Sequence, residues 1–214
     1  MAEKKVDLKT MTRKEKKDYI WYYYKSHMMM GLFAVVLVGS LIYDVMTKDK
    51  IIFSLTLFGE AESGVQIEEI QQDLTQLVAP EATKKEKVLV QFYGLNEVET
   101  SFDEMTDLYQ QKMISQIAAQ ELDLVIMGES DFGFYAEEKM FEALNEISGI
   151  DWNLVEETQL IKDEQTDLVY GIKMAGSQLL NRINYDTNGK VLALINNSLN
   201  KEMAVDVINQ LLSE

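Results

Sequence analysis

The segment from Gly128 to Gly133, with the sequence GESDFG, comes closest to a reactive motif in this chain. Ser130 is one residue away from the spacing of the G-x-S-x-G turn, which exposes a nucleophilic serine. Such a serine needs a neighbouring base, and His27, the single histidine, belongs to a different segment near the N-terminus. The triplet Asp131-Phe132-Gly133 matches that of protein kinases, but the chain has no Gly-rich loop and no His-Arg-Asp segment. We therefore expect neither acyl transfer nor phosphoryl transfer at this segment.

Metal and carboxylate chemistry has equally little support. The chain contains no cysteine, which excludes disulfides, thiol catalysis, cysteine zinc sites and a lipid-modified cysteine anchor. Asp186-Thr187-Asn188-Gly189 begins like a calcium loop, but its spacing and the missing closing Glu favour a tight turn. Paired acids such as Glu68-Glu69, Glu137-Glu138 and Glu156-Glu157 lie in stretches that we predict to be exposed. We expect no enzyme activity, no metal and no cofactor.

The charges of the chain are divided by an uncharged stretch. Residues 1–27 carry eight bases and four acids, residues 28–43 carry no charge, and residues 44–214 carry twelve bases and 32 acids. The net charges of the three parts are therefore +4, 0 and −20. A part as acidic as the third repels nucleic acid and anionic lipid, so we expect no nucleic-acid partner, whereas a basic protein surface is electrostatically acceptable.

The uncharged stretch, MMMGLFAVVLVGSLIY, predicts a membrane-spanning helix. Sixteen helical residues reach only roughly 24 Å of a ~30 Å hydrocarbon core, so the flanks must contribute, and we predict a span over residues 24–46 that contacts the lipid bilayer. Aromatic side chains before the span suit the depth of the lipid headgroups, and a lysine there can extend toward water. The predicted membrane-interface residues are Trp21, Tyr22, Tyr23, Tyr24 and Lys25.

The distribution of bases predicts the orientation of this helix. Lys and Arg cluster on its N-terminal side, which favours a cytoplasmic basic tail at residues 1–23 and an extracellular domain at residues 47–214, anchored in the cell membrane. Two alternatives remain open. The apolar run can be the core helix of a soluble protein, although such a helix normally carries a polar stripe. It can also be a signal peptide cleaved near Val38-Gly39-Ser40, although the lead-in is long for one.

Strand-length apolar runs alternate with helical periodicity in the acidic part. We predict strands over residues 51–58, 87–93 and 122–127, each followed by a helix, and Ser130-Asp131 is expected to cap the third helix. Further strands are predicted over 168–174 and 191–195, before a last helix capped by Ser198 or Asn200. This order implies an α/β fold with a mostly parallel sheet and helices on both faces, in which some of the later strands can be antiparallel.

Three stretches in the same order resemble the extracellular solute-binding proteins, the two-lobed periplasmic-binding-protein type. Residues 114–126 resemble that family's helix leading into an Asp-hydrophobic strand, and residues 132–144 resemble the helix that follows. Residues 191–212, with INNSLNKEMA, resemble its C-terminal strand–helix unit. Tyr170-Gly171-Ile172 is similar to the family's YGIP element, with Lys173 where the family has Pro. The N-terminal arrangement resembles small membrane-anchored proteins of Gram-positive bacteria.

The resemblance implies a single lobe of the two-lobed fold, because residues 147–170 are too few to form the second lobe. Without a second lobe the closing mechanism of a binding protein is lost. The leading hypothesis is a non-enzymatic interaction or accessory module with a protein partner in the membrane or envelope. The alternative is a reduced receptor that delivers a small ligand to an ABC-type importer. Its site would lie at the carboxyl ends of the strands, at Gly59, Glu60, Gly128, Glu129, Ser130 and Asp131.

Overall fold

The computed structural model describes residues 12–59, 64–83, 85–93, 102–163, 165–174 and 176–213. The chain divides into two compact units, Met1–Lys48 and Asp49–Glu214.

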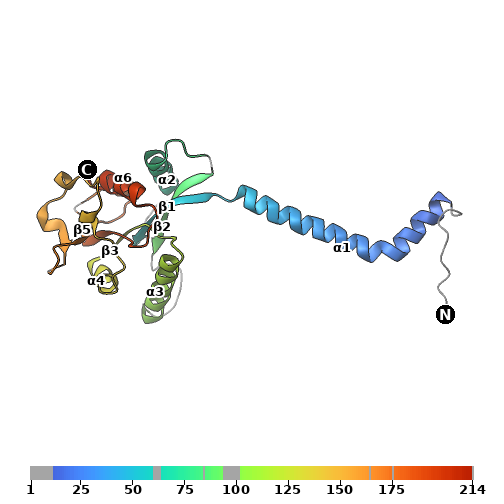
Figure 1. The fold of residues 1–214 in the computed structure, drawn as a ribbon, viewed down its shortest axis with the longest axis horizontal. Coiled ribbons are helices and arrows are strands. Elements are labelled where there is room, and N and C mark those ends of the chain that lie inside the picture. Colours follow the sequence, from blue (N-terminus) through green and yellow to red (C-terminus); the bar gives the residue numbers. More distant parts are fainter. Residues whose placement is uncertain are drawn as a thin grey trace. The chain divides into compact units, whose positions relative to one another are not determined.

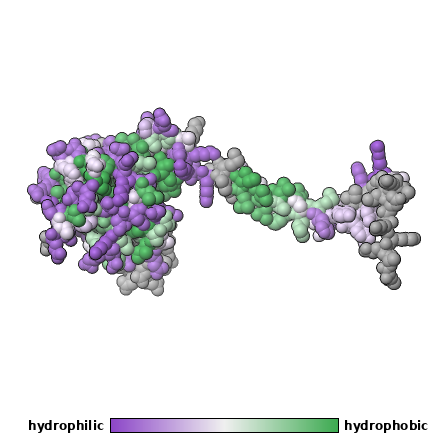
Figure 2. Space-filling model, in the orientation of Figure 1, coloured by the Kyte–Doolittle hydropathy of each residue, from purple (hydrophilic) through white to green (hydrophobic). Residues whose placement is uncertain are grey.

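The first unit contains one long helix, α1 (Arg13–Thr47). Its segment Trp21–Tyr43 is, among the described residues, the one helix long and apolar enough to cross a membrane by length and composition. The apolar side chains of this segment are exposed, and Figure 2 shows an apolar surface over much of the helix, with more hydrophilic residues toward its N-terminal end. None of the segment is buried, which argues against the core helix of a soluble protein. A membrane anchor and a signal sequence are the two interpretations that length and composition permit.

The second unit is built on a six-stranded sheet with the order β2-β1-β3-β6-β5-β4. The strands are β1 (Lys50–Phe58), β2 (Glu86–Tyr93), β3 (Leu124–Gly128), β4 (Leu160–Lys162), β5 (Val169–Lys173) and β6 (Lys190–Leu194). Strand β1 is parallel to β2 and β3, whereas β6 is antiparallel to β3 and β5, and β4 is antiparallel to β5. Four strands, β2, β1, β3 and β5, therefore run in one direction, which confirms the predicted α/β class with a mostly parallel sheet.

Helices cover both faces of this sheet (Figure 1). They are α2 (Gly64–Val78), α3 (Phe102–Ala118), α4 (Glu129–Glu137), α5 (Gln178–Asn181) and α6 (Lys201–Leu212). One apolar core joins the sheet to α2, α5 and α6, and a second joins its other face to α3 and α4. Alternate side chains of a strand point to opposite faces, so β3 supplies Leu124 and Ile126 to the first core and Val125 and Met127 to the second.

The helix predicted from Ser130-Asp131 differs from the observed one. Helix α4 starts at Glu129, with Gly128 as its N-cap, because it follows β3 without a loop. It ends at Glu137 rather than near residue 144. Lys139 adopts a left-handed conformation (φ 57°), and the backbone N–H of Glu142 then donates to Leu194 O at 2.8 Å, so this stretch pairs with the end of β6 instead of continuing the helix.

The edge strand β2 is covered by side chains of α2. The backbone N–H of Val88 donates to Thr75 Oγ1 at 2.8 Å, and that of Val90 donates to the side-chain oxygen of Gln71 at 3.0 Å. Thr75 in turn donates its hydroxyl hydrogen to the backbone oxygen of Gln71 at 2.5 Å. Two donors that would otherwise face outward from the sheet are therefore satisfied within the domain.

Candidate functional site

The carboxyl ends of β1 and β3 meet at one edge of the sheet, where the receptor hypothesis expects a ligand. Gly59 follows β1 with φ +130°, a conformation that side chains rarely adopt, and its N–H donates to Tyr93 O at 3.0 Å. Gly128 ends β3 and pairs with Lys190, the first residue of β6. Because β6 is antiparallel to β3, this edge also receives the turn before β6.

Two side chains from that turn region occupy the space beside Gly59. The hydroxyl oxygen of Tyr185, which is 2% exposed, lies 2.9 Å from Phe58 O and 3.3 Å from Ile126 O. Lys190 Nζ donates to Phe58 O at 2.8 Å and lies 5.8 Å from the centre of the Tyr185 ring. Burial, and secondarily the charge of Asp186, raises the pKa of Tyr185, so the hydroxyl stays protonated and able to donate.

The acidic residues predicted at this edge have separate environments. Glu129 forms an ion pair with Lys173 at 3.1 Å, and its backbone N–H donates to Gly189 O at 3.3 Å. Ser130 and Asp131 are exposed in the first turn of α4. Buried Tyr135, on the same helix, has a pKa raised to about 12, first by burial and then by the charge of Asp131.

The structure therefore brings Gly59, Gly128 and Glu129 to one edge, with Ser130 and Asp131 beside them on α4. Glu60 lies outside the described residues. Sequence reasoning missed Tyr185, Lys190 and Lys173. The signal that could have found the first two is the tight turn at 186–189, where Asp186 Oδ1 accepts from the backbone N–H of Asn188 at 2.9 Å. That turn leads directly into β6. Because β6 starts beside the end of β3, the residues that flank the turn lie at the same edge of the sheet.

Among the residues that the structure describes, the polar side chains of Tyr185, Lys190 and Glu129 at this edge are paired within the domain. Tyr185 and Lys190 are directed at backbone carbonyls of the strands, and Glu129 is directed at Lys173. Within the described part of the chain, Lys190 has no carboxylate partner, so its ammonium is the group there best suited to an anion. No group of three or more His, Cys, Asp or Glu side chains that could hold a metal ion occurs in that part.

A buried polar network lies at the opposite ends of the strands. Asp123, just before β3, is 4% exposed and accepts hydrogen bonds from Ser54 N at 2.8 Å, Ser198 Oγ at 2.6 Å and Asn200 Nδ2 at 3.1 Å. The expected role of Ser198 or Asn200 was to cap the last helix. Asn200 is the N-cap of α6, but its side chain makes no cap hydrogen bond and, like that of Ser198, binds Asp123 instead.

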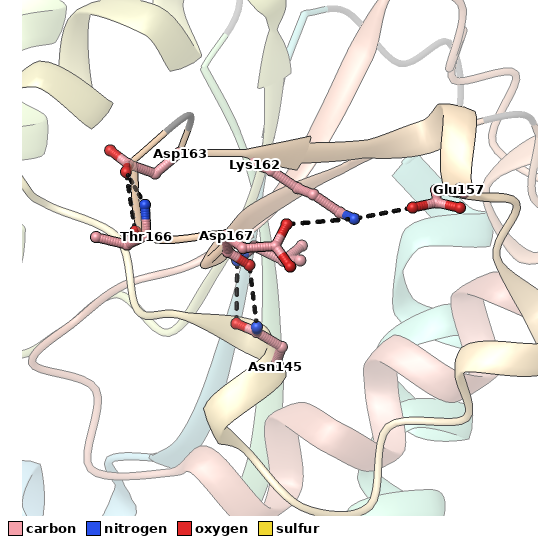
Figure 3. A network of polar contacts seen from close by, with 7 residues as sticks. Asn145, Glu157, Lys162, Asp163, Thr166 and Asp167 are labelled. Atoms are coloured by element: carbon pink, nitrogen blue, oxygen red, sulfur yellow. Dashed lines mark hydrogen bonds and ion pairs between the residues drawn. The ribbon is translucent and has the colours of Figure 1, made fainter.

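The β4–β5 hairpin carries a third polar network (Figure 3). Lys162 Nζ lies 3.1 Å from Glu157 Oε1 and 3.5 Å from Asp167 Oδ1, and the hydrogen bond to Glu157 raises its pKa. Asn145 accepts from Val169 N at 3.0 Å and donates to Asp167 O at 3.3 Å. The two carboxylates are well exposed to solvent, so the ion pairs contribute little to stability, and Asn145 is the residue that holds the hairpin.

Comparisons with known proteins add one distant similarity. No protein-family model matches the chain, and no curated protein matches it. Among solved structures, an extracellular solute-binding protein of family 1 from Alicyclobacillus acidocaldarius subsp. acidocaldarius DSM 446 is similar at 19% sequence identity and a TM-score of 0.36. The similarity covers 60% of this chain and 29% of that protein, so the matched part is less than a third of the other chain.

Proposed function

We propose that this protein is a single-pass, membrane-anchored interaction module without enzyme activity, which binds a protein partner in a bacterial envelope of the Gram-positive type. In this proposal residues 1–23 are a cytoplasmic tail, residues 24–46 cross the bilayer, and the domain at 47–214 is extracytoplasmic. Residues 1–27 contain eight lysines and arginines, whereas the 17 residues after the uncharged stretch contain only Lys48 and Lys50, and this bias supports the orientation.

One observation carries the choice of an interaction module. The strand-end edge, where a receptor would bind its ligand, is occupied by the buried ring of Tyr185 and by Lys190, whose ammonium is bound to Phe58 O. A ligand site normally presents convergent polar groups to an open concave space. Here those groups are directed at the protein's own backbone, which favours recognition through the outer surface of the domain.

The alternative is a reduced receptor for a small anionic ligand. Lys190 supports it, because an ammonium with no carboxylate partner in the described part of the chain can bind a carboxylate or phosphate group. Binding there would require the ammonium to leave Phe58 O, which would keep the hydroxyl of Tyr185 as its hydrogen-bond donor.

Two measurements on the full chain distinguish the two functions. We expect chemical crosslinking in intact cells to recover a specific protein partner, and we expect a set of amino acids, sugars, oligopeptides and inorganic phosphate to leave the thermal unfolding temperature of the purified chain unchanged. A control chain limited to the residues before Asp49 should recover no such partner. Stabilisation of the full chain by one of these solutes, abolished by Lys190→Ala, would instead establish the receptor.

A further inference from the structure

Helices α2 and α6 lie side by side on one face of the sheet (Figure 1). Two neighbouring hollows at their contact form a surface that we call the α2–α6 groove. One end is an open hollow of about 530 Å³ lined by residues of α2, α5 and α6, among them Leu74, Gln178 and Arg182. The other is an open hollow of about 320 Å³ that includes Leu154. Both hollows are lined by Leu77 and Gln210, so these two residues form the centre of one continuous surface.

The walls of this groove are fixed by contacts within the domain. Arg182 donates to Asp73 Oδ2 at 2.6 Å and to Glu69 Oε2 at 3.3 Å, which ties the segment after α5 to α2. Asn209 of α6 accepts from Asp151 N at 2.9 Å and donates to Gly149 O at 2.9 Å. A surface held in this way loses little conformational freedom when a partner binds.

The groove is apolar at its centre and polar at its rim. Leu74 and Leu179 are buried in the floor, while Leu77 is 40% exposed and Leu154 is 38% exposed. The side-chain amides of Gln76, Gln178 and Gln210 line the groove and make no hydrogen bond to any residue that the structure describes. The exposed leucines therefore form a small apolar patch that is bordered by the amide groups.

The charge of the groove selects the kind of partner. Its lining includes Asp73, Asp151 and Asp206, against one base, Arg182. The domain around it, residues 49–214, carries 11 bases and 31 acids, a net charge of −20. Two such domains repel each other, and so do this domain and an acidic surface.

Resting on the proposed function, we infer that the α2–α6 groove is the docking site for a basic segment of the partner protein. The segment places an apolar side chain against Leu77 and Leu154, and its lysines or arginines face Asp206 and Asp151. The free amides of the three glutamines are available to its polar groups. A second copy of the acidic domain, residues 49–214, does not meet the charge requirement.

Photo-crosslinking in the membrane tests this inference. Benzoylphenylalanine is placed in the full chain at Leu77 and, as matched controls of similar exposure on the other face of the sheet, at Ile114 of α3 and Phe134 of α4. We expect a protein adduct at Leu77 that is absent at both controls. The adducted peptide should contain more lysine and arginine than aspartate and glutamate. Asp206→Lys should lower the yield about tenfold, whereas Glu138→Lys, an equal change of charge at the C-cap of α4, should not.

Other outcomes would contradict the docking site, the proposed function or both. An adduct at Leu77 with a second copy of the chain, with lipid, or with an acidic segment would overturn the inference. So would equal effects of Asp206→Lys and Glu138→Lys. Protein adducts at Ile114 or Phe134 with none at Leu77 would overturn the groove but leave the proposed function standing. The absence of protein adducts at all three positions would overturn both. In the supporting case, reversal of one base in the adducted segment to Glu should restore the yield with Asp206→Lys.

Discussion

Asp123 and Ser54 exchange two hydrogen bonds across neighbouring parts of the sheet: Ser54 N–H donates to Asp123 Oδ2 at 2.8 Å, and Asp123 N–H donates to Ser54 Oγ at 2.9 Å. Both residues are buried. The carboxylate also accepts hydrogen bonds from the side chains of Ser198 and Asn200. This one side chain therefore connects β1, the start of β3 and the loop before α6.

Replacement of the Asp123 carboxylate should lower the free energy of unfolding. We expect Asp123→Ala to lower the free energy of unfolding by about 3 kcal/mol, because Ser54 N–H and Ser198 Oγ lose their acceptor in a buried place. Asp123→Asn keeps the shape but directs an amide donor at a donor, and should cost about 2 kcal/mol. Urea unfolding of the detergent-solubilised full chain measures this, with Trp152 as the fluorescent reporter in a Trp21→Phe background. The exposed Asp151→Asn is the control, and a loss as large as that of Asp123→Asn would contradict the assignment.

Gly171 of β5 allows the sheet to approach α4. A Cβ at this position would lie 2.6 Å from Val191 Cγ1 and 2.8 Å from the ring of Phe132, both closer than atoms can pack. Gly171→Ala should therefore lower the free energy of unfolding by about 2 kcal/mol. Gly133→Ala in α4 meets no atom within 4 Å and should be neutral or stabilise by about 0.5 kcal/mol, because alanine favours the helix. Thermal unfolding of the two variants compares them directly, and equal effects would refute the close approach.

The tyrosines of the second core should make stability depend on alkaline pH. Burial raises the pKa of Tyr93 and of Tyr135 to about 12. The unfolded chain ionises these phenols from about pH 10, whereas the folded chain keeps them neutral, so their contribution to stability is complete below pH 10 and decreases toward pH 12. Each phenol contributes a slope of up to about 1.4 kcal/mol per pH unit in that window. Tyr135→Phe should reduce the measured slope of the unfolding free energy against pH, and an unchanged slope would contradict this assignment.

The protection of the outer edge of β2 should depend on the hydroxyl group of Thr75. Thr75→Val keeps the side-chain shape but removes the acceptor of Val88 N–H, and we expect a loss of about 1 kcal/mol together with concentration-dependent self-association. Gln72→Leu, on the exposed side of the same helix, serves as the control for added apolar surface. Sedimentation of the detergent-solubilised chain at increasing concentration measures association. If both variants associated equally, surface hydrophobicity rather than the strand edge would be responsible.

The proposed orientation can be tested with single cysteines, because the chain has none of its own. We expect a membrane-impermeant maleimide to label Gln165→Cys on intact cells and Lys14→Cys only after lysis. Labelling of Lys14→Cys on intact cells would reverse the orientation. A shortened product released into the medium would identify α1 as a cleaved signal sequence instead of an anchor.

The alternation of apolar runs and helical periodicity predicted the class of the sheet and its two covered faces, because these depend on local patterns such as the run at 51–58. The position of β6 was not predictable in the same way. Its antiparallel pairing with β3 is a long-range contact, and it is this contact that brings Lys190 beside Gly59. The local patterns therefore predicted the residues of the candidate site that follow β1 and β3, and they did not predict the residues that the pairing of β6 brings there.

The roles of Ser198 and Asn200 show a related limit. Their types and their place before a helical pattern predicted a cap, which is a local interaction. In the folded domain a buried carboxylate far away in sequence binds both side chains, since an unpaired buried charge costs more than an uncapped helix end. Such competition is decided by tertiary structure and leaves no mark in the local sequence.

Side chains of α2 bind the outer edge of β2 and protect it from pairing with another molecule. This protection differs physically from the repulsion that the net charge provides. Repulsion between acidic domains weakens when ionic strength rises, because dissolved ions screen it within a Debye length of ~8 Å at physiological salt. Hydrogen bonds from Val88 and Val90 to side chains of the same domain are insensitive to screening. In a saline medium, where charge no longer keeps neighbouring copies apart, this edge should still be unable to recruit a strand from another molecule.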